Sequence, residues 1–320
     1  ILCLSLWLSS HPLRAENSVW VNEVEQVQHA DQIGSLFYGS TLPASFVTSD
    51  CDLAGNCPSA CGACCVCRNR REWQLLPDGL LWHSYLAGPQ EPRISTVIYY
   101  DNSEQSYWDI TLGGRVGLIR YGTVGSERPQ GWQWDIEGAV MTRLDMLHAQ
   151  DVESMDYRAG TLITWAGGPW AMKFGYFHIS SHVGDEYLIR NQVGERINYV
   201  TESLIWGTSY SPTIALRLYG EFVNSFRASG GAKRYQFQTG FEYTPVARRT
   251  WWGAPFAACN LNFLEAADYN VSTTVQIGWG FQNPKTERRF RIGVQYADGP
   301  TNQYSYLGRD AVSYTHHRAH

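Results

Sequence analysis

Residues 132–144, with the sequence Trp-Gln-Trp-Asp-Ile-Glu-Gly-Ala-Val-Met-Thr-Arg-Leu, alternate between apolar and polar side chains. Successive residues of a β-strand point to opposite faces, so Trp132 and Trp134 share one face while Asp135 and Glu137 share the other. An amphipathic helix would need apolar residues every three or four positions. The alternation therefore predicts a β-strand with one apolar face and one polar face.

The same alternation recurs along the chain from about residue 91 onward. Several of the repeats span ten residues or more, whereas the strands of most globular sheets are about five or six residues long. We expect eleven strands, at 93–100, 108–118, 132–144, 156–165, 170–180, 196–208, 213–223, 233–243, 256–264, 271–281 and 289–296.

The polar faces of these predicted strands carry Asp, Glu, Arg and Gln, and the apolar faces are aromatic, particularly near the strand ends. This pattern is typical of a transmembrane β-barrel, which turns apolar residues toward lipid and polar residues toward the lumen. We therefore predict an all-β fold, a transmembrane antiparallel up-and-down β-barrel. Bacterial single-chain barrels have an even number of strands, so we expect about 12 strands, with the last one missing from this chain. A large soluble all-β domain is the alternative.

The composition excludes one class of partner and favours another. The chain has 320 residues, of which 25 are basic and 30 acidic, and a formal net charge of −5. A broad electrostatic binder of nucleic acid normally has a basic surplus, so we expect no nucleic-acid partner. No stretch of about 18 consecutive apolar residues occurs, so we expect no membrane-spanning helix. The expected partners are the lipids of an outer membrane.

The two ends of the chain differ from the part between them. Residues 1–15 begin with an apolar run and end in Leu-Arg-Ala, which resembles the end of a secretory signal peptide. Residues 312–320 resemble the translation of a sequencing adapter. We therefore expect a signal-peptide remnant at 1–15, a periplasmic N-terminal segment at 16–90, a barrel in the bacterial outer membrane at 91–311, and an adapter-derived tail at 312–320. The N-terminal segment could make contacts in the periplasm.

Six of the eight cysteines crowd into residues 51–67. Cysteines of an exported protein lie in an oxidising compartment, where thiols pair. We expect disulfide bonds within this insert, and the sequence leaves their pairing open. The spacing of Cys61 and Cys64 also allows zinc binding or redox chemistry, although no histidine lies in the cluster. The disulfide candidates are Cys51, Cys57, Cys61, Cys64, Cys65 and Cys67.

Several motifs together resemble one family. The most specific is the stretch 176–186, Tyr-Phe-His-Ile-Ser-Ser-His-Val-Gly-Asp-Glu. The chain is similar, over roughly residues 75–305, to an uncharacterised bacterial family labelled domain of unknown function 1207, with the cysteine cluster as an insert outside it. The resemblance supports the barrel and implies no established activity. The other motifs are Leu80-Leu-Trp-His-Ser-Tyr-Leu-Ala-Gly-Pro89, Glu91-Pro-Arg93, Gly131-Trp-Gln-Trp134 with Glu137-Gly138, Asp156-Tyr-Arg158 and Arg217-Leu-Tyr-Gly220.

His178 and Ser180 are the sharpest candidates for catalysis. They extend the apolar row of the predicted strand 170–180, so we expect both side chains to face lipid. The pair is similar to the His-x-Ser of outer-membrane phospholipase A and of the lipid A deacylase barrel. That resemblance implies that the imidazole takes the hydroxyl proton and the hydroxyl attacks a lipid ester. A third group must orient the imidazole, and the candidates are Asn191, Gln192, Glu195 and Asn198.

The residues after Ser180 allow two other interpretations. Ser181 and His182 could belong to a hydrogen-bonded outer loop above the lipid headgroups. Asp185 and Glu186 could bind a ligand or calcium, although calcium prefers more oxygen ligands than two carboxylates supply. No other metal motif is present, so we expect no metal site and name calcium as the one candidate cofactor.

The inward faces carry charges of both signs, which leaves the function of the lumen open. Opposite charges could pair across the lumen and plug it, or they could line a narrow pore. We favour a passive barrel or narrow pore of unknown specific activity, with the serine lipid hydrolase as the alternative. A structural anchor that uses the N-terminal segment is a third interpretation. The inward residues are Asp109, Arg115, Asp135, Glu137, Arg143, Arg158, Arg217 and Glu221.

Overall fold

The structure of the protein is a computed structural model. It describes residues 15–25, 71–100, 105–124, 128–192, 198–245, 252–282 and 289–306, and only the backbone of residues 15–25. The predicted signal remnant before Ala15, the cysteine insert 51–67 and the tail 312–320 lie outside the described residues.

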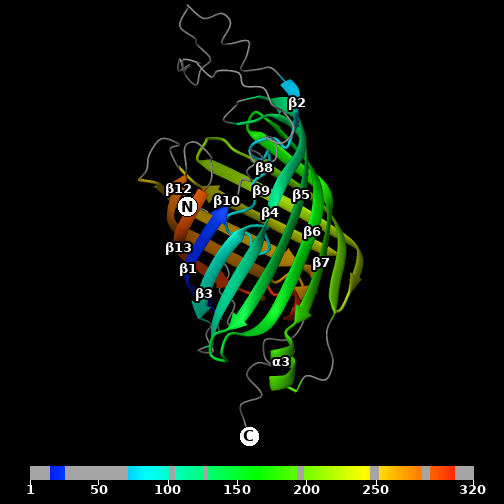
Figure 1. The fold of residues 1–320 in the computed structure, drawn as a ribbon, viewed down its shortest axis with the longest axis vertical. Coiled ribbons are helices and arrows are strands. Elements are labelled where there is room, and N and C mark those ends of the chain that lie inside the picture. The colour runs from blue at the N-terminus through cyan, green and yellow to red at the C-terminus, as the bar shows by residue number, and fades with distance from the viewer. Residues whose placement is uncertain are drawn as a thin grey trace, which may run out of the picture.

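Long antiparallel strands make up most of the described chain (Figure 1). Their bounds are β1 (Ala15–Glu25), β2 (Arg71–Leu75), β3 (Ile94–Tyr100), β4 (Ser106–Thr123), β5 (Gly131–Asp145), β6 (Asp151–Gly167), β7 (Trp170–Val183), β8 (Tyr199–Tyr210), β9 (Leu216–Ser229), β10 (Tyr235–Tyr243), β11 (Ala254–Leu264), β12 (Val271–Gln282) and β13 (Arg289–Asp298). The helical elements among the described residues are short: α3 (Asp185–Arg190) and the 3-10 turns η1 (Glu265–Ala267) and η2 (Tyr304–Tyr306).

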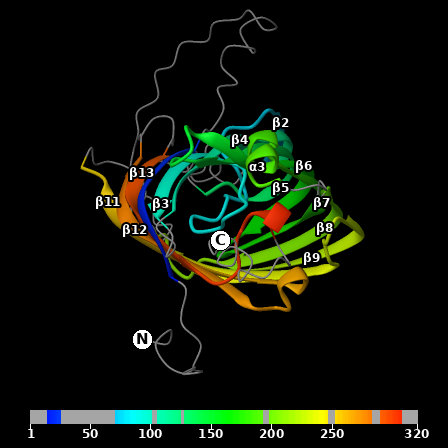
Figure 2. The same ribbon diagram turned by 90° about the horizontal axis from the view of Figure 1, so that it is seen from below.

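The strands form one antiparallel sheet that curves into a barrel (Figures 1 and 2). Neighbours along the chain pair from β3 to β13, β13 pairs with β1, and β1 pairs with β3. Each of these twelve strands therefore has two partners. β2 pairs only with the end of β4. We call the end of the barrel that carries β2 the upper end and the end that carries α3 the lower end.

β1 corrects the prediction that the last strand is missing. Its residues belong to the segment that the sequence analysis places before the barrel, yet they pair with β13 on one side and β3 on the other. The alternation in Ala15–Glu25 is weak, and residues 26–93 separate it from β3, so the local pattern did not reveal it. The pairing satisfies backbone groups of β13 and β3 that would otherwise form open sheet edges.

All eleven predicted strands are confirmed and correspond to β3–β13. One face assignment differs. Strict alternation along 108–118 predicts that Leu118 shares the apolar face of Trp108 and Leu112, but the register shifts between Gly117 and Ile119. A bulge of this kind reverses the facing of the residues that follow it, and Ile119 and Tyr121 become the exposed residues instead.

The buried core lies inside the barrel. The inward side chains are largely polar or charged, and the chain between β2 and β3 runs among them, drawn in cyan within the ring of strands in Figure 2. At the lower end, Arg190 of α3 forms ion pairs with Asp145 and Asp151, which fix the helix to the β5–β6 connection. No helix in the described part of the chain is long and apolar enough to cross a membrane.

Candidate functional site

β7 places a row of polar side chains on the outer wall of the barrel. Phe177, Ile179 and Ser181 are buried toward the lumen, while His178 and Ser180 between them are partly exposed on the other face. The same outer row continues upward through exposed apolar residues as far as Trp170. The structure therefore places the His-Ser pair on the face that the sequence pattern predicts.

The hydrogen-bond partner of Ser180 is His182. The Ser180 Oγ lies 3.3 Å from the His182 Nε2, and the imidazole meets the Tyr157 ring edge-on, with centroids 6.0 Å apart. The His-x-Ser spacing predicted His178 as the partner of Ser180 instead. The His178 ring turns toward β8, because a carboxylate on that strand attracts it. Ser180 therefore forms its hydrogen bond with the histidine that follows it on the same face.

Glu202 of β8 is the group that orients His178. The His178 Nδ1 lies 3.0 Å from the Glu202 Oε1, and the Tyr176 hydroxyl donates to the other carboxylate oxygen. Strand register brings them together, because His178 and Glu202 are direct cross-strand partners. Glu202 is not among the residues predicted from the sequence, although a charged residue in the apolar row of the predicted strand 196–208 was a usable signal.

The orienting groups named from the sequence lie elsewhere. Asn191 follows α3 and donates its side-chain amide to the Tyr187 carbonyl, 2.9 Å away. Asn198 is exposed just before β8, Gln192 is exposed beside Asn191, and Glu195 lies outside the described residues.

The remaining predicted loop residues divide between the lumen and α3. Ser181 points inward and donates to Asp156, so it belongs to the barrel interior rather than to a loop. Asp185 and Glu186 occupy the first turn of α3. No three His, Cys, Asp or Glu side chains gather into a metal site among the described residues. Calcium binding by this turn stays a prediction.

The lumen holds an ion cluster centred on Glu137. Arg115 donates from Nε and Nη2 to the Glu137 Oε2, at 3.0 and 2.5 Å. Arg158 donates from Nε to the Oε1 at 2.8 Å. All three side chains are buried. These residues were predicted to face inward with mixed signs, and neighbouring strands pair them.

Residues 76–93, which we call the plug segment, fill the middle of the lumen. Its Trp82 and Tyr85 side chains are fully buried, at 0% exposure. The Lys173 Nζ lies 5.1 Å from the Trp82 ring and 4.9 Å from the Tyr85 ring, and Tyr85 stacks on Tyr219 with centroids 3.8 Å apart. Burial raises the pKa of the Tyr85 phenol well above its usual range, so Tyr85 stays neutral.

The barrel wall holds the plug segment mainly by its backbone. Three arginines donate to its carbonyls, and the Glu242 carboxylate accepts from the Leu86 N–H at 2.7 Å. Arg93 braces the segment internally by donating to carbonyls within it. The wall contacts are Arg115 to Trp82 at 3.1 Å, Arg217 to His83 at 3.1 Å, and Arg120 to Asp78 and Gly79 at 3.1 and 2.8 Å.

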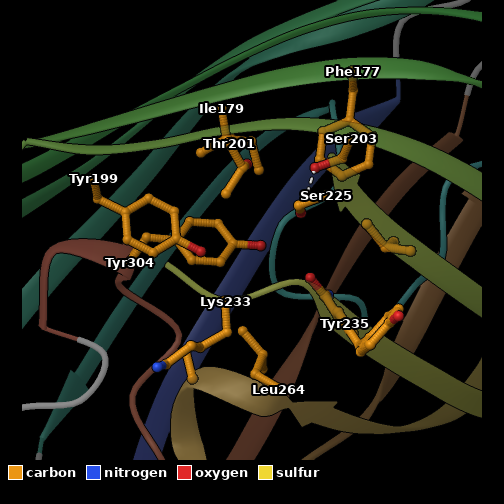
Figure 3. Close-up of a pocket in the computed structure, with 13 residues that line it drawn as sticks. Phe177, Ile179, Tyr199, Thr201, Ser203, Ser225, Lys233, Tyr235, Leu264 and Tyr304 are labelled. Atoms are coloured by element: carbon orange, nitrogen blue, oxygen red, sulfur yellow. Dashed lines mark hydrogen bonds between the residues drawn. The ribbon is translucent and has the colours of Figure 1, made fainter. Parts of the chain in front are cut away.

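Residues 299–306 fill the lower end. Tyr304 stacks on Tyr199 with centroids 4.9 Å apart, and Ser305 lies within hydrogen-bond distance of Ser181, at 2.5 Å between hydroxyl oxygens. Figure 3 shows Tyr304 beside a pocket lined on opposite sides by Phe177 and Leu264. The cavity left there measures about 20 Å³, which is room for about one water.

The fold defines the protein as an antiparallel up-and-down β-barrel with a filled lumen. The family model described as "Protein of unknown function (DUF1207)" matches residues 52–320, and the chain belongs to this family. The match runs through the cysteine cluster from Cys57 and to the end of the chain, so the expected limits of 75–305 were too narrow. No match was found among curated proteins or among solved structures.

Proposed function

We propose that this protein is an outer-membrane β-barrel whose lumen is sealed, so that it acts as a passive barrel rather than an open pore. The observation that carries the proposal is the division of the barrel surfaces. The outer wall is apolar with aromatic residues toward both rims, and the lumen is polar and filled. This division is the arrangement expected of a barrel in lipid.

The aromatic residues of the outer wall form two levels. Exposed tryptophans lie toward the upper end and include Trp132, Trp134, Trp170, Trp206 and Trp279. The lower level consists of exposed tyrosines and phenylalanines, which include Tyr157, Phe226, Phe237, Tyr269 and Tyr296, while others such as Tyr121 accompany the tryptophans at the upper end. Exposed aliphatic side chains lie between them. On β6, Trp165 and Tyr157 stand about 26 Å apart along the strand at ~3.3 Å per residue. At the ~40° tilt of barrel strands this separates the two levels by about 20 Å along the barrel axis, which is comparable with the ~25 Å apolar band of such barrels.

The contents of the lumen support a sealed barrel over a conducting one. The plug segment occupies the middle and residues 299–306 the lower end, and the Gln90 amide of the first donates to the Asn302 carbonyl of the second at 2.5 Å. The cavities beside them measure about 20, 70 and 10 Å³. Spaces of this size hold single waters or small groups of waters.

Reconstitution tests both parts of this proposal. The protein should insert into lipid vesicles with a gel mobility that changes on heating, and planar bilayers that contain it should show no steady single-channel steps. A protein that stays monomeric in buffer and does not associate with vesicles would exclude the membrane assignment. Steady conductance of the wild type would exclude the seal.

A serine lipid hydrolase is the second candidate, favoured by the hydrogen bond between Ser180 and His182 on the outer wall. Polar groups on a lipid-facing surface are unfavourable, and ionisable ones there often have a function. A hydroxyl within reach of an imidazole is the arrangement that activates a serine nucleophile. The pair lies near the lower aromatic level, where lipid esters meet water.

A covalent probe tests the hydrolase. Membranes that contain the protein are treated with a fluorescent fluorophosphonate, and the wild type is compared with Ser180→Ala and Ser181→Ala. Ser181 is the matched control, because it is the adjacent serine and points into the lumen. Labelling should disappear only in Ser180→Ala. Equal labelling of all three proteins, or none of the wild type, would reject a Ser180 nucleophile.

A further inference from the structure

We infer that the plug segment is a removable lid over an anion-binding chamber in the lumen, and that the solutes which displace it carry an oxyanion, either a phosphate or a carboxylate. A removable lid adds a function to the sealed barrel, because a seal need not open. Its release is a property of the lumen and does not depend on lipid around the outer wall.

The buried ions of the barrel wall pair with one another and do not need the plug segment. The Lys173 Nζ of β7 lies 2.5 Å from the Glu221 carboxylate of β9, across Gly207 of β8, which stands between them in the ladder. A Cβ at Gly207 would lie 2.9 Å from the Lys173 Cε, so the missing side chain makes room for this ion pair. Arg115 pairs with Glu137 in the same way, within the wall. Withdrawal of the plug segment therefore leaves no partner of these ion pairs buried alone, which would be strongly unfavourable.

The wall arginines hold the plug segment with donors that their wall partners do not use. Arg115 gives its Nε and Nη2 groups to Glu137 and its Nη1 group to the Trp82 carbonyl. Arg120 gives its Nε to Gln133 and both Nη groups to carbonyls of the plug segment. A carbonyl oxygen is a neutral acceptor, whereas a guanidinium bonds more strongly to a carboxylate or phosphate oxygen. The plug carbonyls therefore occupy positions that the oxygens of an anion would fill better.

Withdrawal of the plug segment makes the chamber more positive. The segment contains Asp78, Glu91 and Arg93, so that two acids against one base give it a formal charge of −1. Glu91 is buried and is attracted electrostatically by both Arg115 and Arg158. Its Oε2 atom forms no hydrogen bond with any described residue. The plug segment thus places a carboxylate with one unpaired oxygen near two guanidinium groups, and a free anion takes that place when the segment withdraws.

The plug segment is a loop that enters and leaves the lumen from above. It follows β2 at the upper end and joins β3 at Ile94, which is the upper end of that strand because β3 runs antiparallel to β4. Arg93 donates to three carbonyls within the segment, so the loop keeps internal hydrogen bonds when it moves. Residues 299–306 stay on the wall through their own hydrogen bonds to β6 and β7. The result is a chamber that opens upward and stays closed below.

Hydrogen exchange of the full chain tests the lid. The amide exchange of peptides from the plug segment and from β5 is followed by mass spectrometry, in chloride, phosphate or acetate at equal ionic strength. Exchange through a local opening follows the population of the open state. Arg120→Gln and Arg217→Gln remove donors to plug carbonyls, and Arg217→Lys keeps the charge. Arg190→Gln is the matched control, because Arg190 pairs with acids at the lower end. Protection of the β5 peptides verifies that each variant is folded.

We expect the plug segment to exchange faster in phosphate or acetate than in chloride, while β5 is unchanged. A chamber with a Kd of about 10 mM speeds exchange about tenfold at about 100 mM anion, because the open population grows as 1 + [anion]/Kd. The oxyanion that acts at the lower concentration identifies the group that the solute carries. Arg120→Gln and Arg217→Gln should exchange faster in chloride and lose most of the response to oxyanions. Arg217→Lys should keep part of that response, and Arg190→Gln should behave as the wild type.

Three results would overturn the inference. Plug amides that exchange in every salt at the rate of the β5 amides would show that the segment leaves only when the whole barrel unfolds. Equal exchange of the wild-type plug segment in chloride, phosphate and acetate would reject the anion-binding chamber. An oxyanion response that persists in both Arg120→Gln and Arg217→Gln would show that the wall arginines do not bind the anion.

Discussion

Glu137 is the residue whose replacement should most weaken the barrel interior. It is shared by Arg115 and Arg158, and the three side chains are 0%, 1% and 8% exposed. Removing one partner of a buried ion pair costs about 3–5 kcal/mol, because the other charge is left buried without compensation. Glu137→Gln keeps the size and one acceptor oxygen, so we expect the lower end of that range, about 3 kcal/mol or roughly a hundredfold in the folding equilibrium.

Unfolding in urea measures this loss. The fraction of folded protein in lipid vesicles is read from unheated gels across a urea series, and the midpoints are extrapolated to the free energy of unfolding. Asp109→Asn is the matched comparison on the neighbouring strand, because Asp109 pairs with Arg143 at 2.9 Å but is 29% exposed. Its loss should be about 1 kcal/mol or less. Equal midpoints for Glu137→Gln and the wild type would show that the arginines find other partners.

Three further changes test other parts of the structure. Gly184→Ala should destabilise the end of β7 by about 1–3 kcal/mol, because an added Cβ would overlap the Val152 carbonyl oxygen. A wild-type urea midpoint would contradict that close approach. Tyr304→Ala should lower the free energy of unfolding by about 3 kcal/mol, because it leaves a cavity at the lower end. A smaller shift of the urea midpoint than that of Asp109→Asn would mean that residues 299–306 do not seal this end. Brominated lipid should quench the tryptophan fluorescence of a variant whose only tryptophan is Trp206, which is 60% exposed, and should not quench that of a variant that retains only the fully buried Trp82. Equal quenching of the two variants would contradict the assignment of the outer wall to lipid.

The strands were predictable because each one carries its own signal. In β5 the alternation from Trp132 onward specifies both the extended conformation and the two faces, and no distant residue is needed to decide either. The bulge after Gly117 was not predictable, because an extra residue in a ladder depends on the neighbouring strand as well as on its own sequence.

The candidate site was predictable in part. The outer-facing pair of His178 and Ser180 follows from strand periodicity. Its partners do not, because Glu202 reaches His178 only through the register of β7 against β8. His182 was already in the motif, but whether Ser180 bonds to the histidine before it or after it depends on how the neighbouring strand attracts each ring.

The sequence by itself determined the class of fold, since period-two alternation is a local property that can be recognised without knowledge of any contact. Only the tertiary structure decided which strand stands between β13 and β3, because that pairing joins segments far apart in the chain. It also decided that residues 76–93 fill the lumen, where the wall arginines hold backbone carbonyls. Carbonyl groups are the same in every residue, so no sequence pattern marks the segment that will receive those hydrogen bonds.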